Sequence, residues 1–222
     1  MISPTLFREL SRFDAQLTVD DNNKIGEGWG SVAYRMKSVA NDWVVRIPKY
    51  PNAPFVGGDL RREASIVRNI QGSNLPVSDE IFVIEDSRGQ LIAAIHKYIY
   101  GSPSNRFAIH GRNNRMKLAD QIGCFLSTLH QIPLTPELGK SVPHIDLWTD
   151  RYVDLIERSL PKLSLRSRDW LREVSNEFQR EVSSHKISEA LLHGDLSAEH
   201  ILVDDDINIS GVIDFGDAMI AD

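Results

Sequence analysis

The chain has 222 residues, 41% of them hydrophobic, and a formal net charge of −6. The length and the hydrophobic content are typical of a globular protein with one large domain or two lobes. The negative net charge argues against nucleic acid as a partner and is compatible with a cationic small-molecule substrate. No apolar run could span a membrane, and the N-terminus lacks the basic start and apolar core of a signal peptide. The single cysteine, Cys124, excludes an internal disulfide framework. We therefore expect a cytoplasmic protein with no membrane partner, in which Cys124 is buried on the apolar side of a helix.

The pattern of residues in the first part of the chain, up to about residue 97, predicts mainly strands. Three apolar residues at helical spacing predict a short amphipathic helix at the start, namely Leu6, Leu10 and Phe13. A glycine-rich turn between two strands follows, with Gly26, Gly28 and Gly30 before Ser31. Glycines at this spacing let backbone amides approach phosphate oxygens, because no Cβ lies in the way. A plain glycine hairpin would explain the same spacing.

Residues 42–48 are predicted to form the next strand, and alternation places Val44 and Arg46 on one of its faces. Asp59 is expected to cap the helix that follows. This helix carries four apolar residues on one face, Leu60, Ala64, Val67 and Ile70.

The predicted strands end in a hairpin, and the composition of the chain changes after it. Strands at 81–85 and 91–95 are joined by typical turn residues. Glycine and proline follow, as at a domain boundary, so we place one domain at 1–97 and a second at 98–222. Residues 104–190 are expected to be mostly helical.

Two aspartates near the end of the chain, Asp195 and Asp214, each lie beside a short apolar run that reads as a buried strand. A polar turn at 204–206 predicts a hairpin that returns Asp214 to a place beside Asp195. Phosphoryl transfer from a nucleotide needs such a pair of carboxylates. One orients and deprotonates the acceptor hydroxyl, and the other holds the metal ion that bridges the phosphates.

The motifs around these aspartates resemble those of a known family. The sequence HGDL at 193–196 resembles the catalytic loop of the aminoglycoside phosphotransferases, and IDFGD at 213–217 resembles their metal-binding motif. Protein kinases have an asparagine where this chain has His200, and a histidine there resembles the aminoglycoside 2″-phosphotransferases and the macrolide phosphotransferases. The resemblance implies a bilobal, protein-kinase-like α+β fold, with an antiparallel-sheet N-terminal lobe that binds nucleotide and a mostly helical catalytic lobe.

The resemblance also implies roles for individual residues. Asp195 would be the catalytic base, while His200 and Asp214 would bind Mg²⁺. Arg46 occupies the position of the phosphate-binding lysine of kinases, and Glu63 would hold it in place. Arginine can make this contact in a bidentate manner, although its geometry differs from that of lysine.

The phosphate donor implied by the resemblance is ATP or GTP, covered by the loop at 26–31. Lys97, Tyr98 and Ile99 would contact the purine, and the sequence leaves the identity of the base open. Lys49 is the alternative phosphate-binding cation.

The acceptor that the resemblance favours is an aminoglycoside, which would make the chain an antibiotic-resistance enzyme. Four carboxylates around a predicted helix, which Thr149 would cap, could bind its ammonium groups or could form a solvated helix face, namely Asp146, Asp150, Asp154 and Glu157. A macrolide phosphotransferase is the alternative enzyme.

The resemblance covers nearly all of the chain, but family members continue with further helices beyond the position of Asp222. Without those helices, part of the apolar surface of the catalytic lobe would be exposed, and self-association through this surface is expected. A truncated kinase-like protein that binds nucleotide without turnover is therefore a further alternative.

Overall fold

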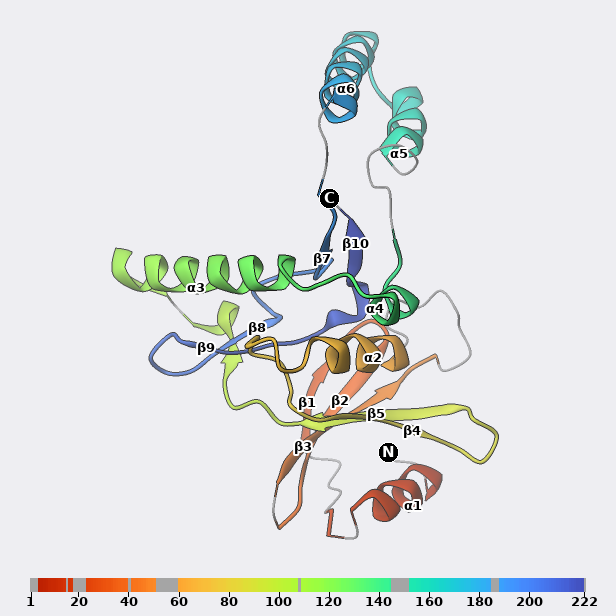
Figure 1. The fold of residues 1–222 in the computed structure, drawn as a ribbon, viewed down its shortest axis with the longest axis vertical. Helices are drawn as coiled ribbons and strands as arrows, with labels where there is room; N and C mark the ends of the chain where they lie inside the picture. Colours follow the sequence, from red (N-terminus) through yellow and green to blue (C-terminus); the bar gives the residue numbers. More distant parts are fainter. Residues whose placement is uncertain are drawn as a thin grey trace.

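The computed structural model describes residues 4–14, 16–17, 23–39, 41–50, 60–107, 109–144, 152–184 and 188–221. The N-terminal half is built on an antiparallel five-stranded sheet with the order β1-β2-β3-β5-β4 (Figure 1). Its strands are β1 (Lys24–Glu27), β2 (Ser31–Lys37), β3 (Asp42–Pro48), β4 (Ile81–Glu85) and β5 (Leu91–Lys97). The glycine-rich turn therefore joins β1 to β2, as the sequence predicts.

Helix α1 (Pro4–Phe13) covers one face of this sheet. Its Leu6 and Leu10 pack against Trp43 and Val45 of β3 in one buried cluster. Because side chains alternate along a strand, Arg46 is left on the opposite face. The apolar packing of α1 thus decides which face of β3 presents the cation.

Helix α2 (Leu60–Ile70) lies on that opposite face and belongs to the cores of both halves. Its first residue, Leu60, packs with Ala94 of β5. Further along, Ile66 and Ile70 join a larger cluster that includes Phe215 from the C-terminal part of the chain. Asp59, the expected cap, lies outside the described residues.

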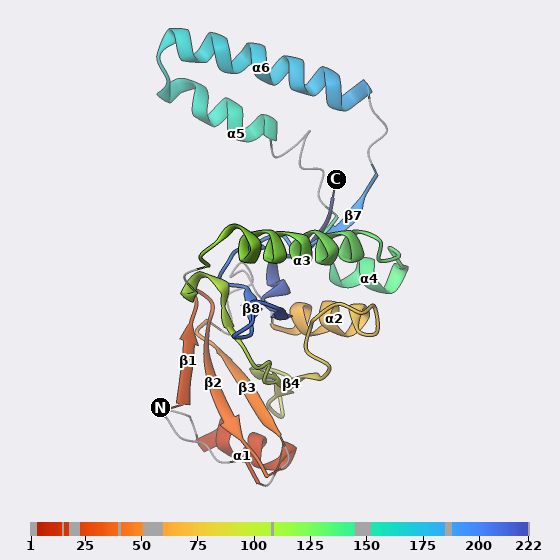
Figure 2. The same ribbon diagram turned by 90° about the vertical axis from the view of Figure 1, so that its left-hand side faces the viewer.

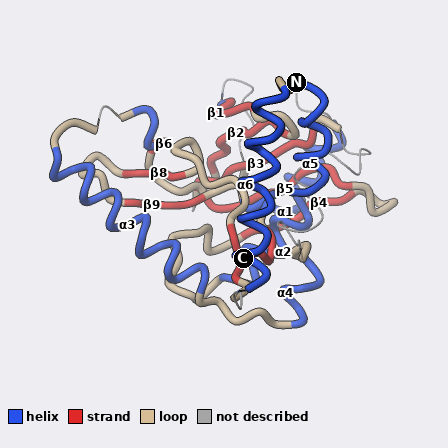
Figure 3. Tube along the Cα trace, turned by 90° about the horizontal axis from the view of Figure 1, so that it is seen from above, coloured by secondary structure: helices blue, strands red, loops and turns tan. Residues whose placement is uncertain are grey.

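The second half combines helices with two small sheets. The strand orders are β6-β8-β9 and β10-β7. The strands are β6 (Ser102–Pro103), β7 (Ala190–Leu192), β8 (Ile201–Val203), β9 (Ile209–Val212) and β10 (Met219–Ala221), and the helices include η2 (Ser104–Arg106), α3 (Arg112–His130), α4 (Pro136–Ser141) and η5 (Phe215–Asp217). Helix α3 runs along one side of the molecule beside β8 and β9 (Figure 3), where Gln121 bonds the backbone of Ile207 and Ile209.

Helices α5 (Tyr152–Ser159) and α6 (Leu165–Ser184) stand apart from the other elements (Figure 2). They lie beside each other and are joined through the short helix η4 (Leu160–Lys162), whose Leu160 is buried. Several of their large apolar side chains are exposed, namely Val153, Leu155, Leu165, Trp170 and Val174. Among the described residues, no helix is both long and apolar enough to cross a membrane.

The expectation that Cys124 is buried is wrong, because the structure places its side chain at the surface. The buried face of α3 is narrow and is centred on Phe125 and Leu129. Cys124 lies on α3 outside that face. Asp146 and Asp150, together with Thr149, lie outside the described residues.

Gly101 sits where the chain passes from β5 to β6, with φ 154°. A Cβ at this position would lie 3.0 Å from the Val203 carbonyl oxygen and would overlap the Ser210 hydroxyl. We predict that Gly101→Ala lowers the free energy of unfolding by about 2 kcal/mol. Urea denaturation measures this change.

Gly123→Ala is the matched control, because a Cβ on Gly123 meets nothing within 4 Å in helix α3. Helix propensity should make this variant more stable by up to about 1 kcal/mol. Equal stability of the two variants would contradict the close approach at Gly101.

Candidate active site

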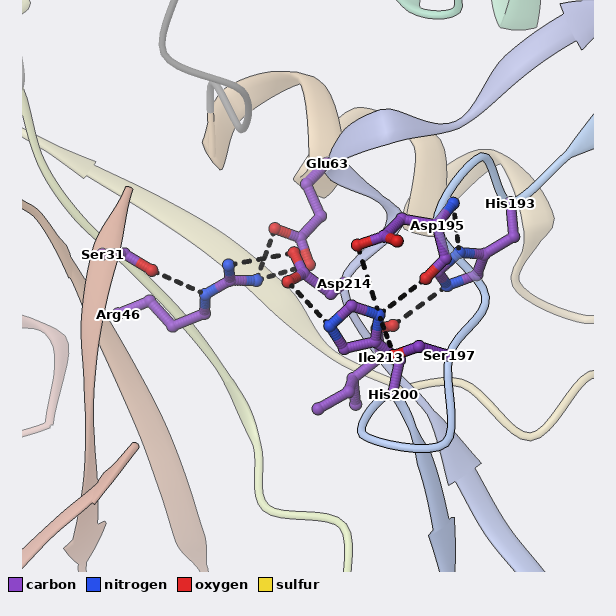
Figure 4. A network of polar contacts seen from close by, with 9 residues as sticks. All are labelled: Ser31, Arg46, Glu63, His193, Asp195, Ser197, His200, Ile213 and Asp214. Atoms are coloured by element: carbon purple, nitrogen blue, oxygen red, sulfur yellow. Dashed lines mark hydrogen bonds and ion pairs between the residues drawn. The ribbon is translucent and has the colours of Figure 1, made fainter. Parts of the chain in front are cut away.

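The guanidinium of Arg46 is the centre of a buried ionic cluster (Figure 4). Its Nη1 lies 2.7 and 2.6 Å from the two carboxylate oxygens of Glu63. Its Nη2 lies 3.1 Å from Oδ1 of Asp214, and its Nε donates to the Ser31 hydroxyl at 3.4 Å. The cluster thus joins β3, helix α2, the start of β2 and the segment after β9.

Burial and charge act against each other in this cluster. Burial lowers the pKa of Arg46, but the charges of Glu63 and Asp214 outweigh this effect and raise the pKa above its usual value. Burial raises the pKa of Glu63, and the charge of Arg46 opposes that rise. The side chains are only 17% and 7% exposed, so each charge depends on the other for neutralisation.

The loop after β7 carries Asp195 and is fixed by its neighbours. His193 is buried, and its Nε2 donates to the Ile213 carbonyl at 3.0 Å, which leaves Nδ1 to accept from the Asp195 N–H at 3.4 Å. Burial lowers the pKa of His193, which favours this neutral form. Gly194 has φ 82°, and a Cβ there would overlap the Asp217 carbonyl oxygen. The carboxylate of Asp195 is 59% exposed.

His200 and Asp214 face each other across the same site (Figure 4). Nδ1 of His200 lies 2.7 Å from the Asp195 carbonyl oxygen, which only accepts, so Nδ1 carries the proton. In the neutral ring, Nε2 then carries the lone pair that could bind a metal, and it lies 3.5 Å from Oδ2 of Asp214. Asp214 has a left-handed backbone, with φ 69° and ψ 56°. This conformation is uncommon for a residue other than glycine and is found at functional sites.

This pair fits a divalent cation. A metal-binding histidine normally donates its other ring N–H to a carbonyl or carboxylate, as His200 does. Among the described residues, no group of three or more His, Cys, Asp or Glu side chains could hold a metal ion. A cation bound by His200 and Asp214 would therefore complete its shell with water and phosphate oxygens, which is usual for Mg²⁺.

A cavity of about 670 Å³ extends from this cluster toward the segment after β5. Its wall includes Val44 and Arg46 of β3, together with His96, Tyr98 and Ile99. The glycine-rich turn supplies Gly26, Gly28 and Ser31. The expected nucleotide-contacting residues are thus mostly brought together, although Lys97 is not in the wall and its Nζ pairs with Glu80 at 2.6 Å.

A second cavity, of about 810 Å³, adjoins the first at the glycine-rich turn. Gly28, Gly30 and Asp195 line it, and it shares Arg46 and Asp214 with the first cavity. The ionic cluster therefore stands where the two cavities meet, so a group bound in one is adjacent to a group bound in the other.

Lys49, the alternative cation, is engaged elsewhere. Its Nζ lies 2.5 Å from Oε1 of Glu27. Hydrogen bonds from Lys24 and then Lys49 lower the pKa of Glu27 to about 2. Arg46 is therefore the basic side chain at the junction of the cavities.

Several residues that shape the site have no role predicted from the sequence. His193 lies within the HGDL motif, which offered a signal, but it was given no role. His96, Arg106 and Glu199 line the first cavity, and Asp217 lines the second. Asp154 and Glu157, the described members of the expected acceptor-binding carboxylates, line neither cavity and are exposed on α5. Asp154 pairs with Arg158 at 2.9 Å.

Comparison with known proteins gives a family and a fold. The model of a family described as the phosphotransferase enzyme family matches residues 21–222. The comparison with curated proteins gives no match.

Several solved structures share the fold. The GDP complex of wild-type aminoglycoside 2'-phosphotransferase-IIIa has a TM-score of 0.75 at 21% identity, over 99% of this chain and 75% of that one. The streptomycin–ATP complex of APH(2")-IIa has a TM-score of 0.69 at 20% identity, over 100% and 73%. Macrolide 2'-phosphotransferase MphH from Brachybacterium faecium has a TM-score of 0.68 at 19% identity, over 96% and 72%. The predicted bilobal, kinase-like α+β fold is confirmed.

Replacing Glu63 should reveal the energetic role of the ionic cluster. Glu63→Ala leaves the buried Arg46 with only Asp214 for neutralisation, so we predict a loss of about 3 kcal/mol in the free energy of unfolding. The control is Glu85→Ala, which breaks the 2.7 Å pair between Arg61 and Glu85 at the surface and should cost less than about 1 kcal/mol. Chemical denaturation of both variants measures the difference. A loss for Glu63→Ala no larger than that of the control would contradict the picture of a buried, mutually dependent pair.

Proposed function

The chain belongs to the phosphotransferase enzyme family, and from this premise we propose that it transfers the γ-phosphoryl group of a purine nucleoside triphosphate to a hydroxyl of a small molecule, most favourably an aminoglycoside. The observation that carries the proposal is the convergence of Arg46, His200 and Asp214 where two cavities meet. Asp195 lies beside them in the wall of the second cavity, 3.7 Å from His200. One cavity suits the donor nucleotide, and the other suits the acceptor.

In this proposal each residue has a task that follows from its chemistry. Arg46, positioned by Glu63, binds phosphate oxygens through N–H groups that Glu63 does not take. The backbone amides between Gly26 and Ser31 cover the phosphates. Asp195, exposed toward the second cavity, orients the acceptor hydroxyl and takes its proton. A Mg²⁺ ion held by His200 and Asp214 would neutralise charge on the phosphates.

The wall of the second cavity favours a cationic acceptor. It contains four carboxylates, Asp195, Glu199, Asp214 and Asp217, whereas Arg46 is its only arginine or lysine among the described residues. Negative charge attracts ammonium groups, which aminoglycosides carry in number. A macrolide presents mainly apolar surface, for which this acidic wall is less suited.

Turnover with a panel of acceptors tests the proposal directly. Nucleotide consumption should rise with one or more aminoglycosides and stay near its background with macrolides. Stimulation by macrolides alone would select the alternative enzyme. Nucleotide binding without stimulation by any acceptor would favour a non-catalytic nucleotide-binding protein.

The role of Asp195 gives a first kinetic prediction. Asp195→Asn keeps the size of the side chain but removes the base, so acceptor phosphorylation should fall by about 10²-fold or more while nucleotide affinity changes little. Asp205→Asn, in the exposed turn between β8 and β9, is the control and should keep full activity. Wild-type turnover by Asp195→Asn would refute the assignment.

If His200 and Asp214 hold Mg²⁺, replacing them should weaken Mg²⁺-dependent nucleotide binding to different extents. Asparagine also adopts the left-handed backbone found at Asp214, so Asp214→Asn mainly removes a negative charge. His200→Ala removes a neutral ligand. The gain in nucleotide affinity on adding Mg²⁺ should therefore fall more in Asp214→Asn than in His200→Ala. Calorimetric titration with Mg²⁺ and with EDTA measures this gain, and a full gain in Asp214→Asn would place the ion elsewhere.

A further inference from the structure

The tip of the glycine-rich turn carries a tryptophan, Trp29, which lines the second cavity. Trp29 is 69% exposed. Among the described residues, the rest of this wall is glycine, small or polar side chains and charged groups, so Trp29 is its only large apolar side chain. The second cavity therefore combines a single indole with a set of carboxylates.

The turn holds Trp29 in place through its backbone. The Gly28 N–H donates to the Ser31 carbonyl at 3.0 Å, and the Lys49 N–H donates to the Gly30 carbonyl at 2.9 Å. A Cβ on Gly28 would meet nothing nearer than the Ser31 carbonyl oxygen at 4.0 Å. Within the part of the chain that the structure describes, the indole makes neither a hydrogen bond nor a contact with another ring. Most of its surface is thus open to a ligand in the cavity.

The carboxylates of the same wall come from the other half of the chain. Asp195 and Glu199 belong to the loop between β7 and β8, and Asp217 follows β9. A molecule bound in this cavity meets negative charge from the C-terminal half and an aromatic ring from the N-terminal half.

An amino sugar has groups that match both features of the wall. Its ammonium groups are attracted to carboxylates and to the face of an indole, which is the aromatic ring that binds cations best. The C–H groups on one face of its ring are apolar and can pack on an aromatic surface. An anionic acceptor would be repelled by the same carboxylates.

We propose that Trp29 is an acceptor-binding residue whose indole packs on a ring of an aminoglycoside while the carboxylates of the second cavity pair with its ammonium groups. This role rests on the proposed phosphotransferase function and assigns a contact within it. Gly28 and Ser31 line both cavities, so the turn that would cover the donor phosphates also carries an acceptor contact at its tip.

Acceptor kinetics with kanamycin, gentamicin and streptomycin provide the first test. Trp29→Ala removes a cation–π contact and covered apolar surface, so the KM for the acceptor should rise about tenfold, with little change in kcat. The affinity for Mg-nucleotide should change less than about twofold, because the indole does not line the first cavity. Trp29→Phe keeps an aromatic face and should raise the acceptor KM less than about threefold.

Trp170→Ala is the matched control. Trp170 is also an exposed tryptophan, at 62%, but it lies on α6 and lines neither cavity. Its replacement should leave the acceptor KM unchanged.

Tryptophan fluorescence provides a second test that does not depend on turnover. The chain has four tryptophans, and aminoglycosides contain no aromatic group, so a change in emission on binding comes from the protein. Covering an exposed indole shifts its emission to shorter wavelength. This shift should appear in the wild-type chain, disappear in Trp29→Phe and persist in Trp170→Phe.

An acceptor KM in Trp29→Ala close to that of the wild type, or a full emission shift in Trp29→Phe, overturns the role of Trp29. Turnover of the wild-type chain would in that case leave the phosphotransferase function standing. A loss of nucleotide affinity as large as the loss of acceptor affinity also overturns it, because the ring would then serve the donor. Failure of the wild-type chain to bind any of the three aminoglycosides refutes the proposed acceptor class together with this role.

Discussion

The charge of Arg46 has to be neutralised inside the protein, and this requirement links the fold to the candidate site. A guanidinium that is only 17% exposed needs partners close by, and here they come from two distant parts of the chain. Glu63 lies on α2, whereas Asp214 follows the β8–β9 hairpin. The cation is therefore stabilised only when α2 and the hairpin are both in place against the sheet. Helix α2 reinforces this coupling, because it contributes to the apolar cores of both halves.

Local patterns predicted the elements well, because short-range periodicity reflects which face is buried. The alternation along residues 42–48 predicted β3, and the buried face against α1 includes Trp43 and Val45 as that alternation implies. The turn residues between β4 and β5 likewise predicted their hairpin. The same reasoning failed for Cys124, because a helical stripe does not say how wide the covered face will be.

Only part of the candidate site could be predicted from the sequence. The pairing of Arg46 with Glu63 depends on tertiary packing, and the resemblance of motifs predicts it where periodicity does not. Neither predicts the contact between Arg46 and Asp214. His193 acts on its loop through ring nitrogens that bond main-chain groups, and such contacts leave no pattern of spacing. The bond between His96 and the Lys97 carbonyl is of the same kind. Contacts between a side chain and the backbone appear only when the fold is known.

The left-handed backbone at Asp214 also bears on how such a chain could change over time. An aspartate in this conformation carries a local cost that glycine would not. If demand for phosphoryl transfer were relaxed, replacement of Asp214 by glycine would relieve this strain, although it would also remove a partner of the buried Arg46. Strain and ion pairing thus oppose each other at one residue, so loss of the carboxylate need not increase stability. The ion pair with Arg46 would therefore favour retention of this carboxylate on grounds of stability as well as of activity.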